Sequence, residues 1–156
     1  EVILLDPVEN HLTLELIDDS YNANPTSMAA SLEVLAVANI EDVKGSAAKG
    51  RRIAYLGDMK ELGPQAVALH ADMAELSSTR ALDVIHCVGP LMKTMFDALP
   101  EAQKGRWTET SAEMVQGIRR DLDAGDIVLA KGSLSMKLAL VVDAIRKMGH
   151  SKEPTT

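Results

Sequence analysis

The sequence is poor in aromatic residues, contains one cysteine and has no long apolar run. Aromatic side chains make up 3% of the 156 residues, so aliphatic side chains and methionine must form the core. Cys87 has no second cysteine to pair with, which is typical of cytoplasmic proteins. No apolar run approaches the roughly 20 residues of a membrane-spanning helix, so we expect a cytoplasmic protein without a membrane partner.

Positive charge is scarce as well. The chain has 16 Lys and Arg against 23 Asp and Glu, which gives a formal net charge of -7 and a pI of about 5.0. This balance excludes a general basic surface, so we expect no nucleic acid as a partner. A local phosphate site stays open, because a few backbone N–H groups and one Lys are enough to form it.

Several motifs of nucleotide and metal sites are missing. The sequence has no G-x-x-x-x-G-K-[S/T] phosphate loop and no G-x-G-x-x-G fingerprint. Its His and Cys residues form no zinc-binding pattern, and its Met residues fall on apolar helical faces as core residues do. A complete ATP-using active site is therefore not encoded here, and we assign no catalytic residue and no metal ligand within the chain.

The remaining composition is that of an ordinary globular domain. Hydrophobic residues make up 46% and charged residues 25% of the chain. We expect residues 1–150 to form one domain, residues 151–156 a disordered tail, and the protein to be a monomer. Because the chain begins with Glu1 rather than Met, we expect it to be a piece of a longer protein or a processed chain.

Short apolar runs alternate with amphipathic segments along the chain. The main expected elements are strands near residues 52–56, 83–88 and 127–130 and helices near residues 25–40, 64–80 and 135–148. Shorter elements are expected as a helix at residues 90–99, a strand at residues 106–108 and a helix capped by Ser111. This alternation predicts an α/β fold with a mainly parallel sheet covered by helices on both faces.

The N-terminal segment has a different pattern. Residues 2–5 are apolar, residues 6–10 indicate a turn, and Leu12, Leu14 and Leu16 then alternate with polar residues as in a half-buried strand. These features predict an N-terminal β-hairpin. Residues 41–50, with two glycines and a serine, predict a surface loop.

Three polar loops each follow an expected strand and precede an expected helix. They are residues 18–24, 57–63 and 131–135. Ligands of parallel α/β sheets bind at the carboxyl ends of the strands, so we expect these loops to converge on one face. The alternative is that they are polar only because loops lie on the surface.

The first loop continues into Pro25 and reads D-D-S-Y-N-A-N-P. Asn24 as a helix cap and Pro25 at the first helical position explain its end. They do not explain two neighbouring carboxylates, Asp18 and Asp19, followed by a tyrosine and another asparagine. A carboxylate at this place can accept two hydrogen bonds from a ribose diol.

The other two loops are weaker signals. Residues 57–63 read G-D-M-K-E-L-G and could place Asp58 and Lys60 near a charged ligand, although charged loops between glycines are common. His70 lies on the helix that follows, where a lone histidine is more often structural than catalytic. Residues 131–135 read K-G-S-L-S, and Lys131 with helix N–H groups suits a carboxylate or phosphate.

Taken together, the motifs resemble one family. D-D-S-Y-N-A-N-P-x-S-M, then G-D-M-x-E-L-G with Leu69-His70, then K-G-S, is similar to the C-terminal domain of the Mur ligases. Within that family the chain resembles most the ligases that add D-alanyl-D-alanine to UDP-N-acetylmuramoyl-tripeptide. The likeness covers nearly the whole chain. Its first motif is long and specific, the second is shared with other Mur ligases and folylpolyglutamate synthases, and the third is short.

The resemblance implies a Rossmann-like domain of a three-domain, ATP-dependent, ADP-forming ligase of peptidoglycan synthesis. The N-terminal domain, which binds the UDP-linked precursor, and the central domain, with the ATP phosphate loop and Mg ligands, are absent from this chain. The domain closes over the nucleotide and helps to position the incoming amine, which attacks an acyl phosphate. The chain alone is therefore expected to be inactive.

Carried onto this chain, the resemblance implies roles for individual residues. Asp19 is expected to contact the ribose, with Asp18 as its rival and Asn22 nearby. The residues expected near the substrate are Tyr21, Asn24, Lys131, Ser133 and Ser135. The roles of Asp58, Lys60 and His70 stay open.

Other readings stay open as well. Within the enzyme class the chain could come from another Mur ligase or from a folylpolyglutamate synthase, although the D-D-S-Y-N-A-N-P string argues against both. In a different class, it could be a non-catalytic module that binds a nucleotide or another protein.

Overall fold

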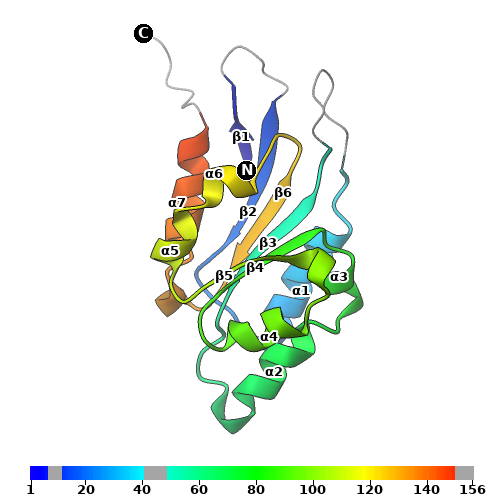
Figure 1. The fold of residues 1–156 in the computed structure, drawn as a ribbon, viewed down its shortest axis with the longest axis vertical. Helices are drawn as coiled ribbons and strands as arrows, with labels where there is room; N and C mark the ends of the chain where they lie inside the picture. Colours follow the sequence, from blue (N-terminus) through cyan, green and yellow to red (C-terminus); the bar gives the residue numbers. More distant parts are fainter. Residues whose placement is uncertain (7–11, 41–48, 150–156) are drawn as a thin grey trace.

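A computed structural model describes residues 1–6, 12–40 and 49–149, and the described strands form one six-stranded sheet in the order β1-β2-β6-β3-β4-β5 (Figure 1). The strands are β1 (Val2–Leu4), β2 (Thr13–Asp19), β3 (Arg52–Gly57), β4 (Val84–Val88), β5 (Lys104–Thr108) and β6 (Ile127–Lys131). β1 pairs antiparallel with β2, and every other neighbouring pair is parallel. The predicted mainly parallel sheet and N-terminal hairpin are confirmed.

Helices cover both faces of the sheet, as predicted. One face carries α1 (Pro25–Ala36), α2 (Ala66–Met73), α3 (Ser77–Arg80) and α4 (Met92–Ala98). The other carries α5 (Ser111–Val115), α6 (Ile118–Asp121) and α7 (Ala139–Met148), which lie together along one side in Figure 1. Three short 3-10 turns, η1 (Gly63–Gln65), η2 (Glu101–Gln103) and η3 (Leu134–Met136), complete the connections.

The sheet separates two hydrophobic cores, and alternate residues along each strand contribute side chains to one core or the other. In β3, Ile53 and Tyr55 face the core under α5–α7, whereas Ala54 and Leu56 face the core under α1–α4. Successive side chains of a strand point to opposite faces, so a strand buried on both sides reads as a continuous apolar run. Each large aliphatic side chain buried in this way stabilises the fold by about 1.5–3 kcal/mol.

The start of α1 follows the prediction closely. Asn24 caps the helix through its side-chain oxygen, which accepts from the N–H of Ser27 at 2.9 Å, and the Ser27 hydroxyl accepts from the N–H of Asn24 at 3.1 Å. The helix ends at Ala36 rather than near residue 40. The guanidinium of Arg52 donates to the carbonyl of Ala38 at 2.8 Å, which holds the chain outside the helical path.

Two predicted helices are each divided in the structure. The segment at residues 64–80 is divided into η1, α2 and α3. The Thr79 hydroxyl donates a hydrogen bond to the carbonyl of Met73 at 2.7 Å, where α2 ends, in place of a helical N–H. The helix predicted from residue 135 begins only at Ala139. Lys137 before it has a left-handed backbone with a φ of 58°.

The helix predicted to begin at Ser111 is also corrected. Its cap is Thr110, whose side chain accepts from the N–H of Glu113 at 3.2 Å. Ser111 lies in the first turn and donates instead to the carbonyl of Met136 at 2.7 Å. The segment then splits into α5 and α6 at Gly117.

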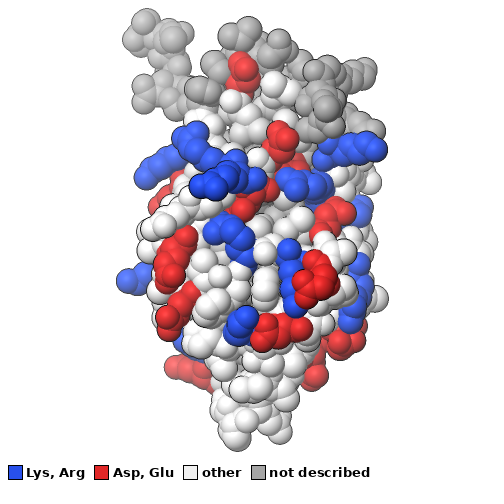
Figure 2. Space-filling view, in the orientation of Figure 1, with Lys and Arg blue, Asp and Glu red and all other residues white. Residues whose placement is uncertain are grey.

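Some predictions fall on residues outside the described part of the chain. The turn at residues 6–10 and the loop at residues 41–50 lie largely there, and the tail at residues 151–156 lies there entirely. Among the described helices, none is long and apolar enough to cross a membrane. On the face shown in Figure 2, Lys and Arg side chains are interspersed with Asp and Glu side chains, so this face has no extended surface of one charge.

A buried polar network fastens the face of the sheet that packs against α6. The carboxylate of Asp121 accepts from the Tyr55 hydroxyl at 2.8 Å and from Nε of Arg106 at 2.9 Å. The ring of His86 stacks on Tyr55 with centroids 4.5 Å apart, and its Nδ1 accepts from the N–H of Arg106 at 2.9 Å. The ring proton of neutral His86 therefore sits on Nε2, which is buried without a hydrogen-bond partner.

This network predicts that the fold loses stability in mild acid. Burial, the largest cause, lowers the pKa of His86 from 6.5 to about 4. Between these values the unfolded chain binds a proton that the folded chain does not, so stability falls as the pH drops from 6.5 toward 4. The expected loss is about 3 kcal/mol, measured as the free energy of unfolding in urea against pH.

The matched control is His86→Asn, whose side-chain oxygen can still accept from the N–H of Arg106. We expect this variant to be less stable at pH 7, since it loses the stacking on Tyr55, but to show a shallower fall between pH 6.5 and 4. Equal slopes for the two proteins would show that His86 does not cause the acid sensitivity.

Candidate functional site

A pocket of about 450 Å³ opens at the carboxyl ends of β2, β6 and β3, and we call it the main pocket. The predicted convergence is found, because each of the loops at residues 18–24, 57–63 and 131–135 contributes part of its length to the wall. The lining residues are Tyr21, Asn22, Ala23, Asn24, Lys60, Glu61, Leu62, Ser133, Leu134 and Ser135. Parallel strands end at one edge of a sheet, which brings the connections that follow them together.

Hydrogen bonds between the loops hold this arrangement. The N–H of Lys60 donates to the Ser133 hydroxyl at 2.9 Å, and the N–H of Ser133 donates to the carbonyl of Asp58 at 3.1 Å. Nζ of Lys131 donates to the carbonyl of Asn22 at 3.0 Å. These hydrogen bonds therefore link the three loops to one another.

Asp19 and Lys131 form a partly buried ion pair behind the main pocket. The ammonium of Lys131 lies 2.8 Å from Oδ2 of Asp19, and the side chains are 2% and 26% exposed, respectively. The Ser31 hydroxyl donates to the same oxygen at 2.7 Å. Burial opposes ionisation of the carboxyl, but these hydrogen bonds from Lys131 and Ser31 outweigh it and lower the pKa of Asp19.

This pair changes what can be expected of Lys131. Its ammonium is already engaged by Asp19 and Asn22, and Lys131 is not among the residues that line the main pocket. An incoming carboxylate would have to displace the pairing with Asp19. Lys131 is therefore suited to fix the first loop against β6 rather than to meet a ligand directly.

The two neighbouring carboxylates of the first loop point to opposite faces of the sheet. Oδ1 of Asp18 accepts from the N–H and the hydroxyl of Ser20 at 3.1 and 2.6 Å, and Oδ2 lies 3.5 Å from the guanidinium of Arg146 on α7. Asp19 instead faces Ser31 on α1 and Lys131. Alternation along β2 thus places only one of the two beside the loops that form the main pocket.

Asp58 is a fully buried carboxylate at the centre of the loop cluster. Its Oδ1 accepts from the N–H of Met92 at 2.7 Å, where α4 begins, while Oδ2 is buried without a hydrogen bond and lies 3.7 Å from Nζ of Lys60. The Lys60 side chain is 43% exposed. The negative charge of Asp58 therefore attracts the ammonium of Lys60 to the entrance of the pocket. The ammonium remains accessible to an anion there.

His70 has a structural position. Its Nε2 accepts from the N–H of Met59 at 2.9 Å, and Nδ1 donates to the carbonyl of Ala66 at 2.7 Å. The ring is fully buried and both nitrogens are engaged. His70 thereby ties the second loop to α2, which agrees with the structural interpretation of a lone helical histidine.

Four lining residues of the main pocket were not singled out from the sequence: Ala23, Glu61, Leu62 and Leu134. Leu134 is 70% exposed and faces the same pocket as Tyr21, which is 65% exposed. Glu61 has a left-handed backbone with a φ of 63°, which is uncommon for a residue other than glycine. A leucine between two serines in K-G-S-L-S was the only signal for this apolar rim.

The chemistry offered by the main pocket is that of binding and orientation. It presents a lysine, two serine hydroxyls, two asparagines and a tyrosine, which suit carboxylates, amides and hydroxyls. Among the described residues, no group of three or more His, Cys, Asp or Glu side chains is arranged to hold a metal ion.

Sequence relatives of known name cover most of this chain. It is 32% identical over 144 residues to the UDP-N-acetylmuramoyl-tripeptide–D-alanyl-D-alanine ligase of Haemophilus influenzae, a match of 91% of this chain and 29% of the relative. It is 30% identical over 142 residues to the ligase of the same name from Bacillus subtilis, a match of 88% of this chain and 29% of the relative. The chain thus spans under a third of the length of these relatives.

Solved structures with the same fold carry related names. The UDP-N-acetylmuramoylalanyl-D-glutamyl-2,6-diaminopimelate–D-alanyl-D-alanyl ligase of Acinetobacter baumannii matches with a TM-score of 0.61 and 27% identity, over 93% of this chain and 28% of that one. The MurF ligase of Thermotoga maritima, in complex with ADP, matches with a TM-score of 0.67 and 22% identity, over 86% of this chain and 28% of that one. The second likeness shows the fold alone.

The family itself follows from a match over most of the chain. Residues 5–134 match the family described as Mur ligase, glutamate ligase domain. The resemblance inferred from the polar motifs is thereby confirmed. This chain belongs to the Mur ligase family, as its glutamate ligase domain.

Proposed function

We propose that this chain is the C-terminal domain of an ATP-dependent ligase that joins D-alanyl-D-alanine to a UDP-N-acetylmuramoyl-tripeptide. The observation that carries the proposal is the meeting of three polar loops in one pocket, in a chain of the Mur ligase family. The names of the two sequence relatives state these same substrates. The domain positions substrates and excludes water, and it makes no covalent bond itself.

Asp19, which like Lys131 is not itself among the lining residues of the main pocket, is the residue we assign to the ribose of the nucleotide. Two of the hydrogen-bond donors on its carboxylate, Lys131 and Ser31, reach Oδ2. Tyr21 also interacts with this carboxylate, but its side chain is largely exposed, so a ribose hydroxyl can replace it at little cost. The Thermotoga relative is a complex with ADP, so a nucleotide is a ligand of that protein. Asn22, at the pocket wall beside Tyr21, is assigned to the same ligand.

Lys60 takes the place that the sequence had suggested for Lys131. Its ammonium is exposed at the pocket, held near Asp58, and has no closer anion among the described residues. We assign it to the carboxylate of D-alanyl-D-alanine, together with Ser133, Ser135, Tyr21 and Asn24 of the same pocket wall. Lys131 acts one step away, by holding Asp19 and the first loop in place.

The rest of the reaction is assigned to the rest of the longer protein. ATP, when bound, supplies the phosphoryl group that activates the carboxyl of the tripeptide. Since the described residues offer no cluster for Mg, we assign its ligands, and the site of the UDP-linked precursor, to the N-terminal and central domains. Cytoplasmic residence is part of the proposal, because Cys87 is unpaired and buried.

Lys60→Ala in the full-length enzyme tests this assignment. Loss of a charge-assisted hydrogen bond should raise the KM for D-alanyl-D-alanine about tenfold to a hundredfold and leave the KM for ATP unchanged. Steady-state kinetics with each substrate varied in turn measures both constants. Lys147→Ala, on α7 away from the pocket, is the matched control. In a separate measurement, the 156-residue chain alone should release no phosphate from ATP. A Lys60→Ala enzyme with wild-type constants would contradict the assignment.

A further inference from the structure

Glu61 is a carboxylate in the wall of the main pocket to which the proposed function gives no role. It follows Lys60 directly in the chain, and these two are the only charged residues among the described residues that line the pocket. The ion pair of Asp19 and Lys131 lies behind the wall. The carboxylate of Asp58 is fully buried next to Lys60. The pocket therefore presents one ammonium and one carboxylate to a ligand.

The Glu61 carboxylate has no partner within the described part of the chain. None of the hydrogen bonds or ion pairs within residues 1–6, 12–40 and 49–149 involves its side chain, although the residue is exposed and adjacent to Lys60. By contrast, the nearby carboxylates of Asp19 and Asp58 each accept a hydrogen bond. Because Glu61 and Lys60 form no ion pair with each other in the described chain, both charges are available to a ligand.

The backbone at Glu61 supports a role for its side chain. Its φ of 63° lies in the left-handed region, where a residue with a Cβ is less stable than glycine. Gly63, two positions further on, also has a positive φ, of 72°, and there the sequence does supply a glycine. Strain of this kind is concentrated at functional sites, which is consistent with a side chain that is kept for its contacts to a ligand.

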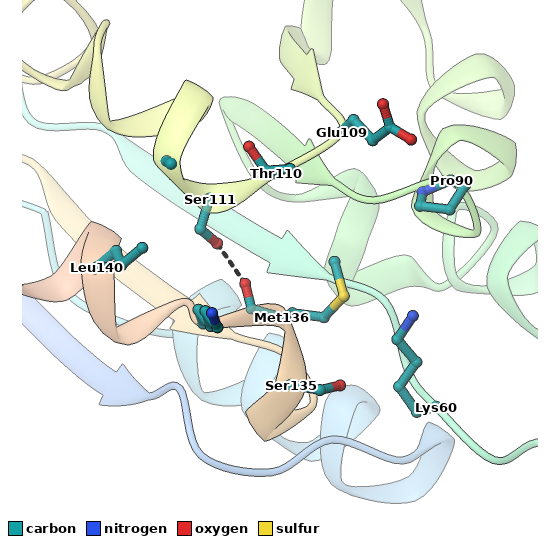
Figure 3. A pocket seen from close by; sticks show the side chains of 10 residues that line it. Lys60, Pro90, Glu109, Thr110, Ser111, Ser135, Met136 and Leu140 are labelled. Atoms are coloured by element: carbon teal, nitrogen blue, oxygen red, sulfur yellow. Dashed lines mark hydrogen bonds between the residues drawn. The ribbon is translucent and has the colours of Figure 1, made fainter.

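A second carboxylate, that of Glu109, lies in a second pocket that adjoins the main pocket (Figure 3). This second pocket has a volume of about 450 Å³ and shares Lys60 and Ser135 with the main pocket. Figure 3 shows Lys60 and Glu109 on either side of Pro90. Glu109 is not among the residues that line the main pocket, so the carboxylate that shares the main pocket with Lys60 is that of Glu61.

We infer that Glu61 binds the ammonium of the incoming dipeptide while Lys60 binds its carboxylate, so that the two residues together select a zwitterion. The inference rests on the proposed function and adds the amine end of the same ligand to it. Two extended residues span about 7 Å, which is longer than an ion pair, so a dipeptide can reach both side chains without their neutralising each other. A phosphate fits less well, because Lys60 attracts it but Glu61 repels it.

Two analogues of the dipeptide that each keep one charge test this division. D-lactyl-D-alanine has the carboxylate but a hydroxyl in place of the ammonium, and D-alanyl-D-alaninol has the ammonium but no carboxylate. In the full-length enzyme, Glu61→Gln should raise the KM for D-alanyl-D-alanine and the inhibition constant of D-alanyl-D-alaninol about tenfold. The inhibition constant of D-lactyl-D-alanine should change little. An unchanged KM in Glu61→Gln, or an equal rise for D-lactyl-D-alanine, would overturn the inference.

Three further variants separate this role from folding and from the second pocket. Glu61→Gly suits the observed φ, so its unfolding temperature should be equal to or above that of the wild type while the KM for D-alanyl-D-alanine rises about tenfold. Glu61→Asp keeps the charge and should recover part of the affinity lost in Glu61→Gly. Glu109→Gln is the matched control and should leave this KM unchanged. A rise in Glu109→Gln but not in Glu61→Gln would contradict the inference.

Lys60→Ala distinguishes a failure of this inference from a failure of the proposed function. It should raise the inhibition constant of D-lactyl-D-alanine about tenfold and leave that of D-alanyl-D-alaninol unchanged. If Lys60→Ala has this effect and Glu61→Gln has none, the role of Glu61 is refuted and the proposed function stands. If Glu61→Gln has its expected effect and Lys60→Ala has none, the place proposed for the dipeptide carboxylate is refuted and the role of Glu61 stands.

Discussion

Asp19→Ala is expected to lower the free energy of unfolding by about 3 kcal/mol and to weaken the use of ATP in the full-length enzyme. Without Asp19, the ammonium of Lys131 stays buried, at 2% exposure, with no counterion. A buried charge that loses its partner costs about 3–5 kcal/mol, and the partial exposure of Asp19 places this case at the lower end. The proposed ribose contact is lost and the first loop keeps only one of its two contacts with Lys131, the hydrogen bond to the carbonyl of Asn22, so the KM for ATP should rise.

Urea unfolding of three further variants identifies the cause. Ser31→Ala removes one hydrogen bond from the same carboxylate and should cost about 1 kcal/mol. Lys131→Met should cost less than Asp19→Ala, because the remaining carboxylate is partly exposed and can be hydrated. The double variant Asp19→Ala, Lys131→Met should be more stable than Asp19→Ala alone. A double variant less stable than either single one would show that the buried charge is not the source of the loss.

Gly89→Ala is the second change with a large expected effect. A Cβ at Gly89 would lie 2.4 Å from Oδ1 of Asp58, and the φ of +108° is one that side chains rarely adopt. The carboxylate cannot retreat without losing the hydrogen bond from the N–H of Met92. We expect a loss of about 3 kcal/mol in the free energy of unfolding, together with a displaced Lys60 and a raised KM for D-alanyl-D-alanine.

The chain offers a matched control in Gly63→Ala. Gly63 also has a positive φ, +72°, but a Cβ there would meet no atom within 4 Å. This variant should cost about 1 kcal/mol, from backbone strain alone, so the difference between the two variants measures the clash with Asp58. Similar losses in both would mean that Asp58 does not restrict Gly89.

The fold was predictable because its signals are local. Apolar runs such as residues 127–130 are buried on both faces, and the cap at Asn24 and the proline after it place the start of α1. The helix interruptions were not predictable, since they depend on contacts between distant residues. The Thr79 side chain donates a hydrogen bond to the carbonyl of Met73, and the Arg52 side chain donates one to the carbonyl of Ala38. Neither contact leaves a pattern in the sequence.

The candidate site was predictable in its position but less so in its details. Loops after parallel strands meet at one edge of the sheet, so the sequence was enough to bring residues 18–24, 57–63 and 131–135 together. It could not show that Lys131 is paired with Asp19 across 112 positions, so a change in either residue also alters the surroundings of the other. It also gave no means of choosing Lys60, whose exposure becomes known only in three dimensions.

The most direct test of the account is a crystal structure of the full-length enzyme with an ATP analogue and D-alanyl-D-alanine bound. We predict the ribose within hydrogen-bonding distance of Asp19 and the dipeptide carboxylate within hydrogen-bonding distance of Lys60, with the pair of Asp19 and Lys131 intact. Both ligands bound with none of the loops at residues 18–24, 57–63 and 131–135 in contact with them would contradict the account.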